Sequence, residues 1–572
     1  MSIPLAKVYE PNANARNPDD YIALVGGIDK TTVIFRSESV TNTSASFPAC
    51  NPPSESHLVD RKVYFRARFR IRFTGNSTTG NLLKKGRDGL RFMPLSSIIF
   101  DLRTTINSQS VNCNLSDTIH ARSRYWKQGV NQRSQTTSAS GVIDNVQNYS
   151  DSFGITNSPL SGFGDSGLTS GQGRGCITDL EIISNTPTGA EVRFTVFEPA
   201  ILAPFIHDEN SCVGTLWRVN TLAFDLQFEN INRIWCHDRA SAGTITAMDT
   251  TLENMECFVT FITPPRGLDV PPVCVVPYDQ WNRLETDVGV MNPNEEKIVT
   301  TSVYQFQQVP QSVYLFCKPS RNAIVGSLVE TIGTSDTFTQ ISNISINFNN
   351  RNQLLSNVTS EQLFKISVEN GLNMDYQNFR GVIQGTFDGP RVGLSGSVIK
   401  LLFGKDIAGE EIIPGLGGAK GRCNFQLQAT VKNINQTRAL PYTFYVVPCY
   451  EGYMTISNQS NVTCIAPINE VEDVIASPES RVTFNDYNET MGGSLWDWIK
   501  KAHNWVKDNK VVSTAMSMIP QTRAFAPVAA SMGYGTGGAC MAAGTGGAIS
   551  AAGVYGGRSL TTAQLKKLRG MK

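Results

Sequence analysis

The sequence predicts an all-β protein with two β-sandwich domains in tandem, a C-terminal amphipathic helix and a flexible tail. Between Lys62 and Ile456 the apolar residues recur in short alternating runs, as they do in strands. At Ser494 the period changes to that of a helix, and a Gly/Ala-rich segment follows. Because 572 residues exceed what one core supports, we expect two domains plus terminal segments.

Composition narrows the class of protein. Charged residues make up only 17% of the chain, which favours sheets with long polar loops over helical bundles. The net charge is +1, so no global field attracts nucleic acid or membranes, and any such affinity must be local. The twelve cysteines are scattered singly without a CxxC pair, which predicts buried free thiols rather than a disulfide framework or a zinc site.

The first expected domain covers residues 59–266 and follows an extended arm over 1–58 that is rich in Pro, Asn and Ser. Its first strong strand is VYFRARFRIRF at residues 63–73, where apolar side chains alternate with Tyr64 and four arginines. Further strand-like runs are Ser96–Ile106, Glu191–Phe197, Leu216–Phe228 and Met255–Ile262. The Ser/Gly/Thr/Asn-rich stretch Asn131–Gly175 is too long for a connector and predicts a surface loop.

The second expected domain covers residues 297–470. Five prolines within residues 264–282 predict an interdomain linker, which we place at 267–296. The second series of strand-like runs is Val299–Phe306, Ser312–Phe316, Phe338–Phe348, Val398–Phe403, Asn424–Val431 and Tyr442–Ile456. One helix, from Glu361 to Glu369, interrupts this series. Two successive blocks of short strands indicate two sandwiches side by side.

Residues 471–520 are expected to hold a linker and one amphipathic helix over 494–519, capped by Ser494 and ended by Pro520. The candidate membrane-active residues at its start are Leu495, Trp496, Trp498, Ile499, Ala502, Trp505 and Val506. Docking on the protein's own β body or on a partner subunit explains the apolar stripe, whereas three tryptophans and four lysines favour a membrane surface. The two interpretations do not exclude each other.

Residues 521–572 form a Gly/Ala-rich basic tail without any Asp or Glu. Its candidate contacts to nucleic acid or anionic lipid are Arg558, Lys566, Lys567, Arg569 and Lys572. A tail of this kind can also serve solubility alone.

Candidate catalytic patterns do not predict an enzyme. Cys236, His237 and Asp238 are consecutive, and neighbouring side chains of a strand point to opposite faces, so they cannot converge on one atom. A GxGxxG match at residues 162–167 lies in the long loop without a strand before it or a helix after it. The sequence predicts no cofactor and no metal.

The arginine face of the first strand has two interpretations. Arg66, Arg68, Arg70 and Arg72 could neutralise the phosphates of a packaged nucleic acid. They could equally form a solvated outer face or pair with acids on neighbouring strands. The second interpretation is preferred, because charged outward faces are routine in antiparallel sheets.

The segments LRFMPLSSIIFDLRTTINSQSVNC and GSVIKLLFGKDI, together with the two β blocks, resemble viral major capsid proteins of the double jelly-roll lineage (adenovirus, virophage and polinton-like). The resemblance spans roughly residues 60–465. It implies two jelly-roll domains, trimeric capsomers, an icosahedral shell and no catalytic residues. Separately, GGSLWDWIKKAHNWVK is similar to the membrane-lytic segments of adenovirus internal proteins and of small RNA virus coats.

The resemblance implies a structural capsid protein located in the virion and made in the host cell without a secretory signal. Its expected partners are copies of itself, other capsid proteins, the viral genome through the tail and a host membrane through the helix. One alternative is a single jelly-roll coat protein with a β projection, from a small RNA or single-stranded DNA virus. Another, of a different class, is a non-viral carbohydrate-binding β protein.

Overall fold

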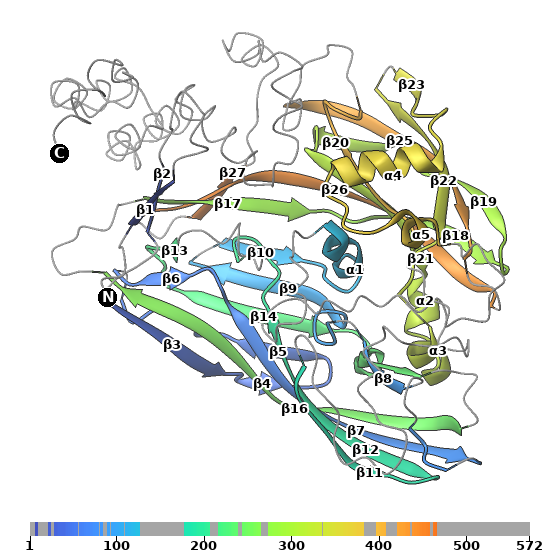
Figure 1. The fold of residues 1–572 in the computed structure, drawn as a ribbon. Helices are drawn as coiled ribbons and strands as arrows, with labels where there is room; N and C mark the ends of the chain where they lie inside the picture. Colours follow the sequence, from blue (N-terminus) through green and yellow to red (C-terminus); the bar gives the residue numbers. More distant parts are fainter. Residues whose placement is uncertain are drawn as a thin grey trace, which may run out of the picture.

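The computed structural model describes residues 28–125, 177–205, 215–237, 243–264, 273–381, 396–407 and 420–465, apart from short gaps, and two strands nearer the N-terminus. Those two strands, β1 (Ala6–Tyr9) and β2 (Tyr21–Leu24), pair with each other. The described residues build two β-sandwiches (Figure 1). This architecture confirms the two predicted β-sandwich domains.

The first sandwich consists of a seven-stranded and a five-stranded antiparallel sheet. The larger sheet has the order β11-β12-β7-β16-β6-β13, with β3 also paired to β16. Its strands are β3 (Asp29–Arg36), β6 (Leu58–Asp60), β7 (Tyr64–Ser77), β11 (Ile177–Asn185), β12 (Gly189–Pro199), β13 (Thr215–Leu216) and β16 (Gly243–Thr263). The smaller sheet, in the order β10-β9-β14-β5-β4, contains β4 (Ser39–Val40), β5 (Ser44–Phe47), β9 (Ile99–Ile106), β10 (Gln109–Cys113) and β14 (Leu222–Phe228).

Strand β7 shows why the alternating sequence folds in this way. Its phenylalanines point into the core, where Phe69 stacks on Phe194 of β12 with ring centroids 5.2 Å apart. Phe65 reaches across the sandwich to Phe47 and Phe224 of the five-stranded sheet. Burying a Phe side chain completely contributes about 2 to 3 kcal/mol, so this one strand supplies much of the first core.

The second sandwich has a six-stranded and a five-stranded sheet. The six-stranded sheet has the order β17-β26-β21-β24 with β18 and β27 also on β26, and it contains β17 (Val273–Trp281), β18 (Leu284–Met291), β21 (Ser312–Pro319), β24 (Val398–Leu402), β26 (Leu440–Ser457) and β27 (Val462–Ile465). The five-stranded sheet has the order β19-β25-β22-β23 with β20 on β25, and it contains β19 (Glu296–Thr300), β20 (Tyr304–Gln308), β22 (Gln340–Phe348), β23 (Arg351–Leu354) and β25 (Lys420–Lys432).

Short helices connect and cover these sheets. They are α1 (Ile119–Arg122), η1 (Ser123–Tyr125), η4 (Ile231–Ile234), α2 (Arg321–Ile324), α3 (Leu328–Gly333), α4 (Ser360–Glu369) and α5 (Tyr376–Arg380). Helix α4 confirms the helix expected at 361–369, packs against β22 and β24, and begins at a capping box between Thr359 and Gln362. The remaining two strands, β8 (Asp88–Leu90) and β15 (Trp235–His237), pair with each other.

Two segments differ from their sequence-based descriptions. Part of the expected arm over 1–58 belongs to the first sandwich, because β3 pairs with β16 and β5 pairs with β14. Ala45 and Phe47 are buried there, so a short alternating run was concealed by its Ser and Thr neighbours. The expected linker over 267–296 contains β17 and β18, both paired to β26. Pro277 is tolerated there because β17 lies at the end of its sheet.

Other predicted features lie outside the described residues. These are the surface loop over 131–175, the GxGxxG match at 162–167, the helix over 494–519 and the basic tail over 521–572. Among the residues that the structure does describe, no helix has the length and apolar character needed to cross a bilayer.

Candidate functional site at the interdomain junction

Each sandwich inserts structure into the core of the other. From the second sandwich, Ile332 of α3 and the strand residues Cys274 of β17 and Met454 of β26 belong to the first hydrophobic core. In the other direction, Ala121 of α1 packs in a cluster with Tyr314 and Tyr445 of the second sandwich. Figure 1 shows α1 between the strands of the two sandwiches. The junction is therefore an exchange of core elements, not a flat contact.

Tyr125, at the end of η1, fixes this exchange. Its hydroxyl donates a hydrogen bond to the backbone oxygen of Val398 at 2.8 Å. Its ring meets the ring of Tyr314 edge to face, with centroids 5.2 Å apart. Burial raises the pKa of the Tyr125 hydroxyl well above its usual value, so the group remains a neutral donor.

A buried carboxylate, Asp336, lies at the centre of the junction. It precedes β22 in the second sandwich, and its side chain is only 5% exposed. Two arginines of the first sandwich bind it: Arg233 Nη2 donates to Oδ1 at 2.5 Å, and Arg91 Nη1 donates to Oδ2 at 3.3 Å. His120 Nε2 of α1 lies 3.5 Å from the same Oδ2. Three segments of the first sandwich thus converge on one residue of the second.

The same arginines also bind the end of α3. Arg233 Nη1 donates to the carbonyl oxygens of Thr331 at 2.8 Å and Thr334 at 2.6 Å, and Arg91 Nη2 donates to that of Thr331 at 3.0 Å. The last carbonyls of a helix carry partial negative charge, so these contacts complement the carboxylate. The guanidinium groups therefore satisfy most of their hydrogen-bonding capacity within the second sandwich.

The electrostatics follow from burial and pairing. Burial opposes ionisation of Asp336, but Arg233, His120, Arg91 and Lys318 outweigh it and hold the pKa of that carboxyl well below its usual range. For His120 burial is the dominant cause: it lowers the imidazole pKa to about 4 despite the attraction of Asp336. His120 is therefore neutral at pH 7, and the charge at the centre is carried by the carboxylate and the arginines.

A second ion cluster supports the first. Asp117 of the first sandwich lies 3.0 Å from Lys318 Nζ of β21 and also pairs with Arg283 of the second sandwich. Lys318 Nζ donates to the carbonyl oxygen of Ser116 at 3.2 Å. Burial lowers the pKa of Lys318 to about 8, with the attraction of Asp336 working in the opposite direction. Both clusters join cations and carboxylates across the junction.

An open cavity of about 450 Å³ borders the junction. It is lined by Thr43, Ser44, Phe100, Gln227, Phe228, Glu229, Arg321 and Val325. The Arg321 guanidinium lies 4.2 Å from the ring centroid of Phe100 and pairs with Glu229, so its charge is used within the protein. Arg321 of α2 thus contacts the first sandwich at this cavity.

Of the consecutive residues Cys236, His237 and Asp238, the structure describes the first two, and Asp238 lies outside the described residues. His237 Nδ1 lies 2.7 Å from Asp88 Oδ1, and Trp235 Nε1 donates to the same oxygen at 3.3 Å. The Cys236 thiol donates to the backbone oxygen of Gly89, away from the imidazole. The described residues also include no group of three or more His, Cys, Asp or Glu able to hold a metal ion.

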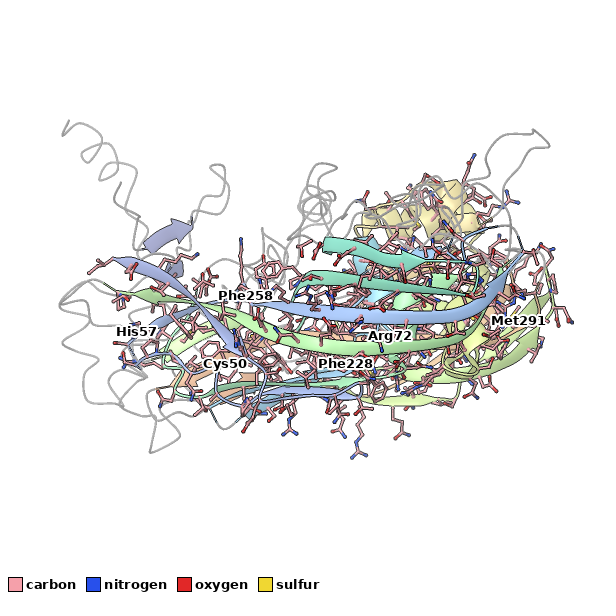
Figure 2. The ribbon with its side chains drawn as sticks, turned by 90° about the horizontal axis from the view of Figure 1, so that it is seen from below. Cys50, His57, Arg72, Phe228, Phe258 and Met291 are labelled. Atoms are coloured by element: carbon pink, nitrogen blue, oxygen red, sulfur yellow. The ribbon has the colours of Figure 1, made fainter. Side chains whose placement is uncertain are left out.

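The arginine face of β7 forms ion pairs with acids on neighbouring strands, which confirms the preferred interpretation. We call this set the arginine ladder: Arg36, Arg66, Arg68, Arg70, Arg72 and Arg193 with Glu191, Glu253 and Glu256. Each glutamate is shared by two arginines. Figure 2 labels Arg72 on β7 and Phe258 on β16 of this sheet.

The predicted site residues lie outside the described residues: Leu495, Trp496, Trp498, Ile499, Ala502, Trp505 and Val506 of the helix, and Arg558, Lys566, Lys567, Arg569 and Lys572 of the tail. The junction around Asp336 was not predicted. Its members come from five separate parts of the chain and share no motif, so sequence offered no signal for it.

Comparison with known proteins assigns the fold. The family model of the Sputnik virophage major capsid protein first domain matches residues 8–261, and that of the major capsid protein V20 C-terminal domain matches residues 284–452. The putative capsid protein V20 of Sputnik virophage is 32% identical over 597 aligned residues, covering 99% of both chains.

Solved structures agree. The cryo-EM structure of the Sputnik virophage matches with a TM-score of 0.71 and 30% identity, covering 85% of this chain and 98% of that chain. The mavirus major capsid protein matches with a TM-score of 0.61 over 78% of this chain and 92% of that chain, at 14% identity, which supports the fold alone. Both sandwiches are therefore jelly-rolls, and the single jelly-roll and carbohydrate-binding alternatives are set aside. The chain is a structural protein of the virion capsid and belongs to the Sputnik virophage major capsid protein family.

Proposed function

We propose that this chain builds the virion shell as a homotrimer, without catalysis, and that each chain acts as one rigid body of two jelly-rolls. The observation that carries this proposal is the buried junction around Asp336. A subunit that must present two sandwiches at a fixed angle needs an interface that does not hinge. Ordinary interfaces between domains of one chain permit relative motion unless they are large and apolar.

The junction supplies this rigidity in two ways. Apolar insertion in both directions means that separating the sandwiches would expose Ile332 and Ala121 to water. The ion clusters fix the relative orientation of the two sandwiches, because Asp336 and Asp117 each bind cations of the opposite sandwich at fixed positions. Bidentate and charge-assisted hydrogen bonds restrict orientation more than apolar contacts do.

The test is negative-stain electron microscopy and mass photometry of the purified full-length protein. We expect trimers with hexagonal outlines, or closed particles. Asp336→Asn should reduce assembly because the angle between the sandwiches is no longer fixed, whereas Asp249→Asn, at an exposed position of β16, should assemble normally. Monomers of the wild-type protein at every salt concentration and pH tried would contradict the proposal.

We propose in addition that the 494–519 helix disrupts a membrane or docks internally, on the protein's own β body or on a partner subunit. The support is its sequence: an apolar stripe with Trp498 and Trp505 opposite a lysine-rich face. Full-length protein should release dye from anionic vesicles, and Trp498→Glu combined with Trp505→Glu should abolish this release. Val512→Glu with Met516→Glu, further along the helix, should have a smaller effect. Unchanged leakage in the double tryptophan variant would show that the stripe is not the active surface.

The basic tail is proposed to contact the genome or an internal membrane, and other capsid proteins are further partners. Arg558, Lys566, Lys567, Arg569 and Lys572 concentrate positive charge without a compensating acid. Replacing these five residues by Gln should reduce the nucleic acid that copurifies with particles, measured by absorbance ratio and extraction. Equal nucleic acid content in particles of the wild type and the variant would leave lipid as the contact of the tail. Cosedimentation of the protein with anionic vesicles measures that binding.

A further inference from the structure

Two buried cysteines of the first core come from opposite sheets. Cys50 follows β5, and its backbone N–H donates to the oxygen of Leu222 in β14 at 2.8 Å, which fixes it to the five-stranded sheet. Cys257 lies in β16 of the seven-stranded sheet. Both side chains are 0% exposed and belong to the same hydrophobic core. Figure 2 labels Cys50 within this sandwich.

Aromatic contacts show that the two cysteines occupy the same level of the sandwich. Cys257 is in register with Phe65 on the neighbouring strand β7. Phe65 crosses the sandwich and meets Phe47 at 5.9 Å and Phe224 at 5.6 Å between ring centroids. Phe47 lies three positions before Cys50 in the chain, and Phe224 lies two positions after Leu222. The neighbours of the two cysteines thus touch across the core.

Cys50 is the neighbouring group that acts on the Cys257 thiol. Burial raises the pKa of the Cys257 thiol well above its usual value, and a hydrogen bond with the Cys50 thiol raises it further. Cys274 is a useful contrast in the same core: it is also 0% exposed, but its pKa is set by burial, the Trp217 backbone and Arg61, with no cysteine involved. Cys50, Cys257 and Cys274 are all free and buried.

We propose that Cys50 and Cys257 are a latent disulfide that a peroxide closes in the folded protein, joining the two sheets of the first sandwich. The peroxide oxidises one thiol to a sulfenic acid and releases one water. The sulfur of the other cysteine attacks the sulfenic sulfur, the S–S bond forms, and hydroxide leaves with the second thiol proton as another water. Two thiols and one peroxide give one disulfide and two waters.

The environment makes this reaction slow and conditional. The raised pKa of the Cys257 thiol keeps its thiolate scarce, so oxidation is slow in the thiol-rich interior of a cell. A virion protein also meets oxidising surroundings, where disulfides persist. The covalent bond would then connect positions far apart in sequence and restrict the unfolded chain, which stabilises the native sandwich.

Peptide mapping of the full-length protein tests the proposal. Fully reduced protein is freed of reductant, incubated with hydrogen peroxide for hours, unfolded in an alkylating reagent and digested without reduction. We expect a cross-linked peptide pair containing Cys50 and Cys257, and a melting temperature raised by roughly 5 °C or more that returns to its original value on reduction. Recovery of both cysteines alkylated, or as sulfinic acids without the cross-link, would overturn the proposal.

Matched variants make the assignment specific. Cys50→Ser and Cys257→Ser should each abolish the peroxide-dependent rise in melting temperature. Cys274→Ser removes an equally buried thiol of the same core and should keep both the cross-link and the rise. A rise that persists in Cys50→Ser would assign the effect to other cysteines. Should a serine variant fail to fold, the peptide map of the wild-type protein alone decides.

Discussion

The arginine ladder and the junction use the same chemistry at different depths. In the ladder, Arg68 and Arg72 have side chains 47% and 57% exposed, and each shares a glutamate with another arginine. At the junction, Arg91 and Arg233 are 0% and 6% exposed and share Asp336. Both sites place two guanidinium groups on one carboxylate. Their difference is that water reaches the first and not the second.

That difference decides what each site can do. A ladder arginine that loses its glutamate is solvated by water, so the pair contributes little and cannot hold two elements together. A junction arginine that loses Asp336 keeps an uncompensated charge in a low-dielectric interior, which is costly. The ladder is therefore a solvated outer face, whereas the junction enforces one relative position of the two jelly-rolls.

The largest effect is expected from Asp336→Asn. This change leaves Arg91 and Arg233 buried without their carboxylate, and breaking a buried ion pair in this way costs about 3 to 5 kcal/mol. The midpoint of denaturant unfolding should fall accordingly, whereas Asp249→Asn on the exposed face should change it little. Equal stabilities of the two variants would show that water reaches the junction.

Acidification should lower the stability that the junction contributes. The folded-state pKa of His120 is lowered from 6.5 to about 4, so the protein binds fewer protons folded than unfolded in this range. The contribution of His120 to the free energy of unfolding is fully present above pH 6.5. It is lost as the pH falls towards 4, by about 3 kcal/mol in total. Asp336, whose pKa is lowered, adds a further loss below its ordinary value of 3.8.

The measurement is the melting temperature between pH 7 and pH 4. In His120→Gln the loss between pH 6.5 and pH 4 should shrink, because no buried imidazole takes up a proton on unfolding. A control, His57→Gln, replaces a partly exposed histidine that lies outside the junction. Parallel profiles of the wild type and His120→Gln would contradict the assignment of the acid limb to the junction.

Backbone packing gives a third comparison. Gly396 adopts φ +79° beside the junction, and a Cβ there would lie 2.2 Å from the backbone oxygen of Phe338. Gly189, on β12 of the ladder sheet, would place a Cβ 3.3 Å from the oxygen of Phe73. Gly396→Ala should therefore lower the stability by about 2 to 3 kcal/mol. Gly189→Ala should cost less than about 1 kcal/mol. Thermal unfolding of both variants measures the difference, and equal shifts would argue against close packing at the junction.

Strands with period-2 alternation were predictable because the pattern is local. Residues 63–73 read directly as a half-buried strand, and the acids that pair with its arginines lie on adjacent strands, as sheet geometry suggests. The segments 29–36 and 273–281 were misassigned, because Thr residues in the first and Pro277 in the second hid strands whose assignment depends on pairing with β16 and β26. Local composition does not determine pairing with a distant strand.

The junction was not predictable for a related reason. Arg91, His120, Arg233 and Asp336 are each separated by tens of residues or more, and their meeting depends on how the two sandwiches dock. Each residue alone reads as an ordinary surface charge. Only the three-dimensional placement turns four polar residues into one buried cluster, so a single sequence gives no signal for it.

The smallest effect is expected on the ladder itself, from Glu253→Gln. Glu253 lies 3.6 Å from Arg68 Nε and 3.3 Å from Arg193 Nε, and its side chain is 25% exposed. Its loss should cost less than about 1 kcal/mol, because the Arg68 side chain is 47% exposed and water can replace the carboxylate there. The loss should shrink further between low salt and about 1 M salt, where exposed charges are screened within about 3 Å. Melting curves at the two salt concentrations measure this. A cost near that of Asp336→Asn, unchanged by salt, would mean that the ladder face is covered in the protein's assembled state and that its charges are buried there too.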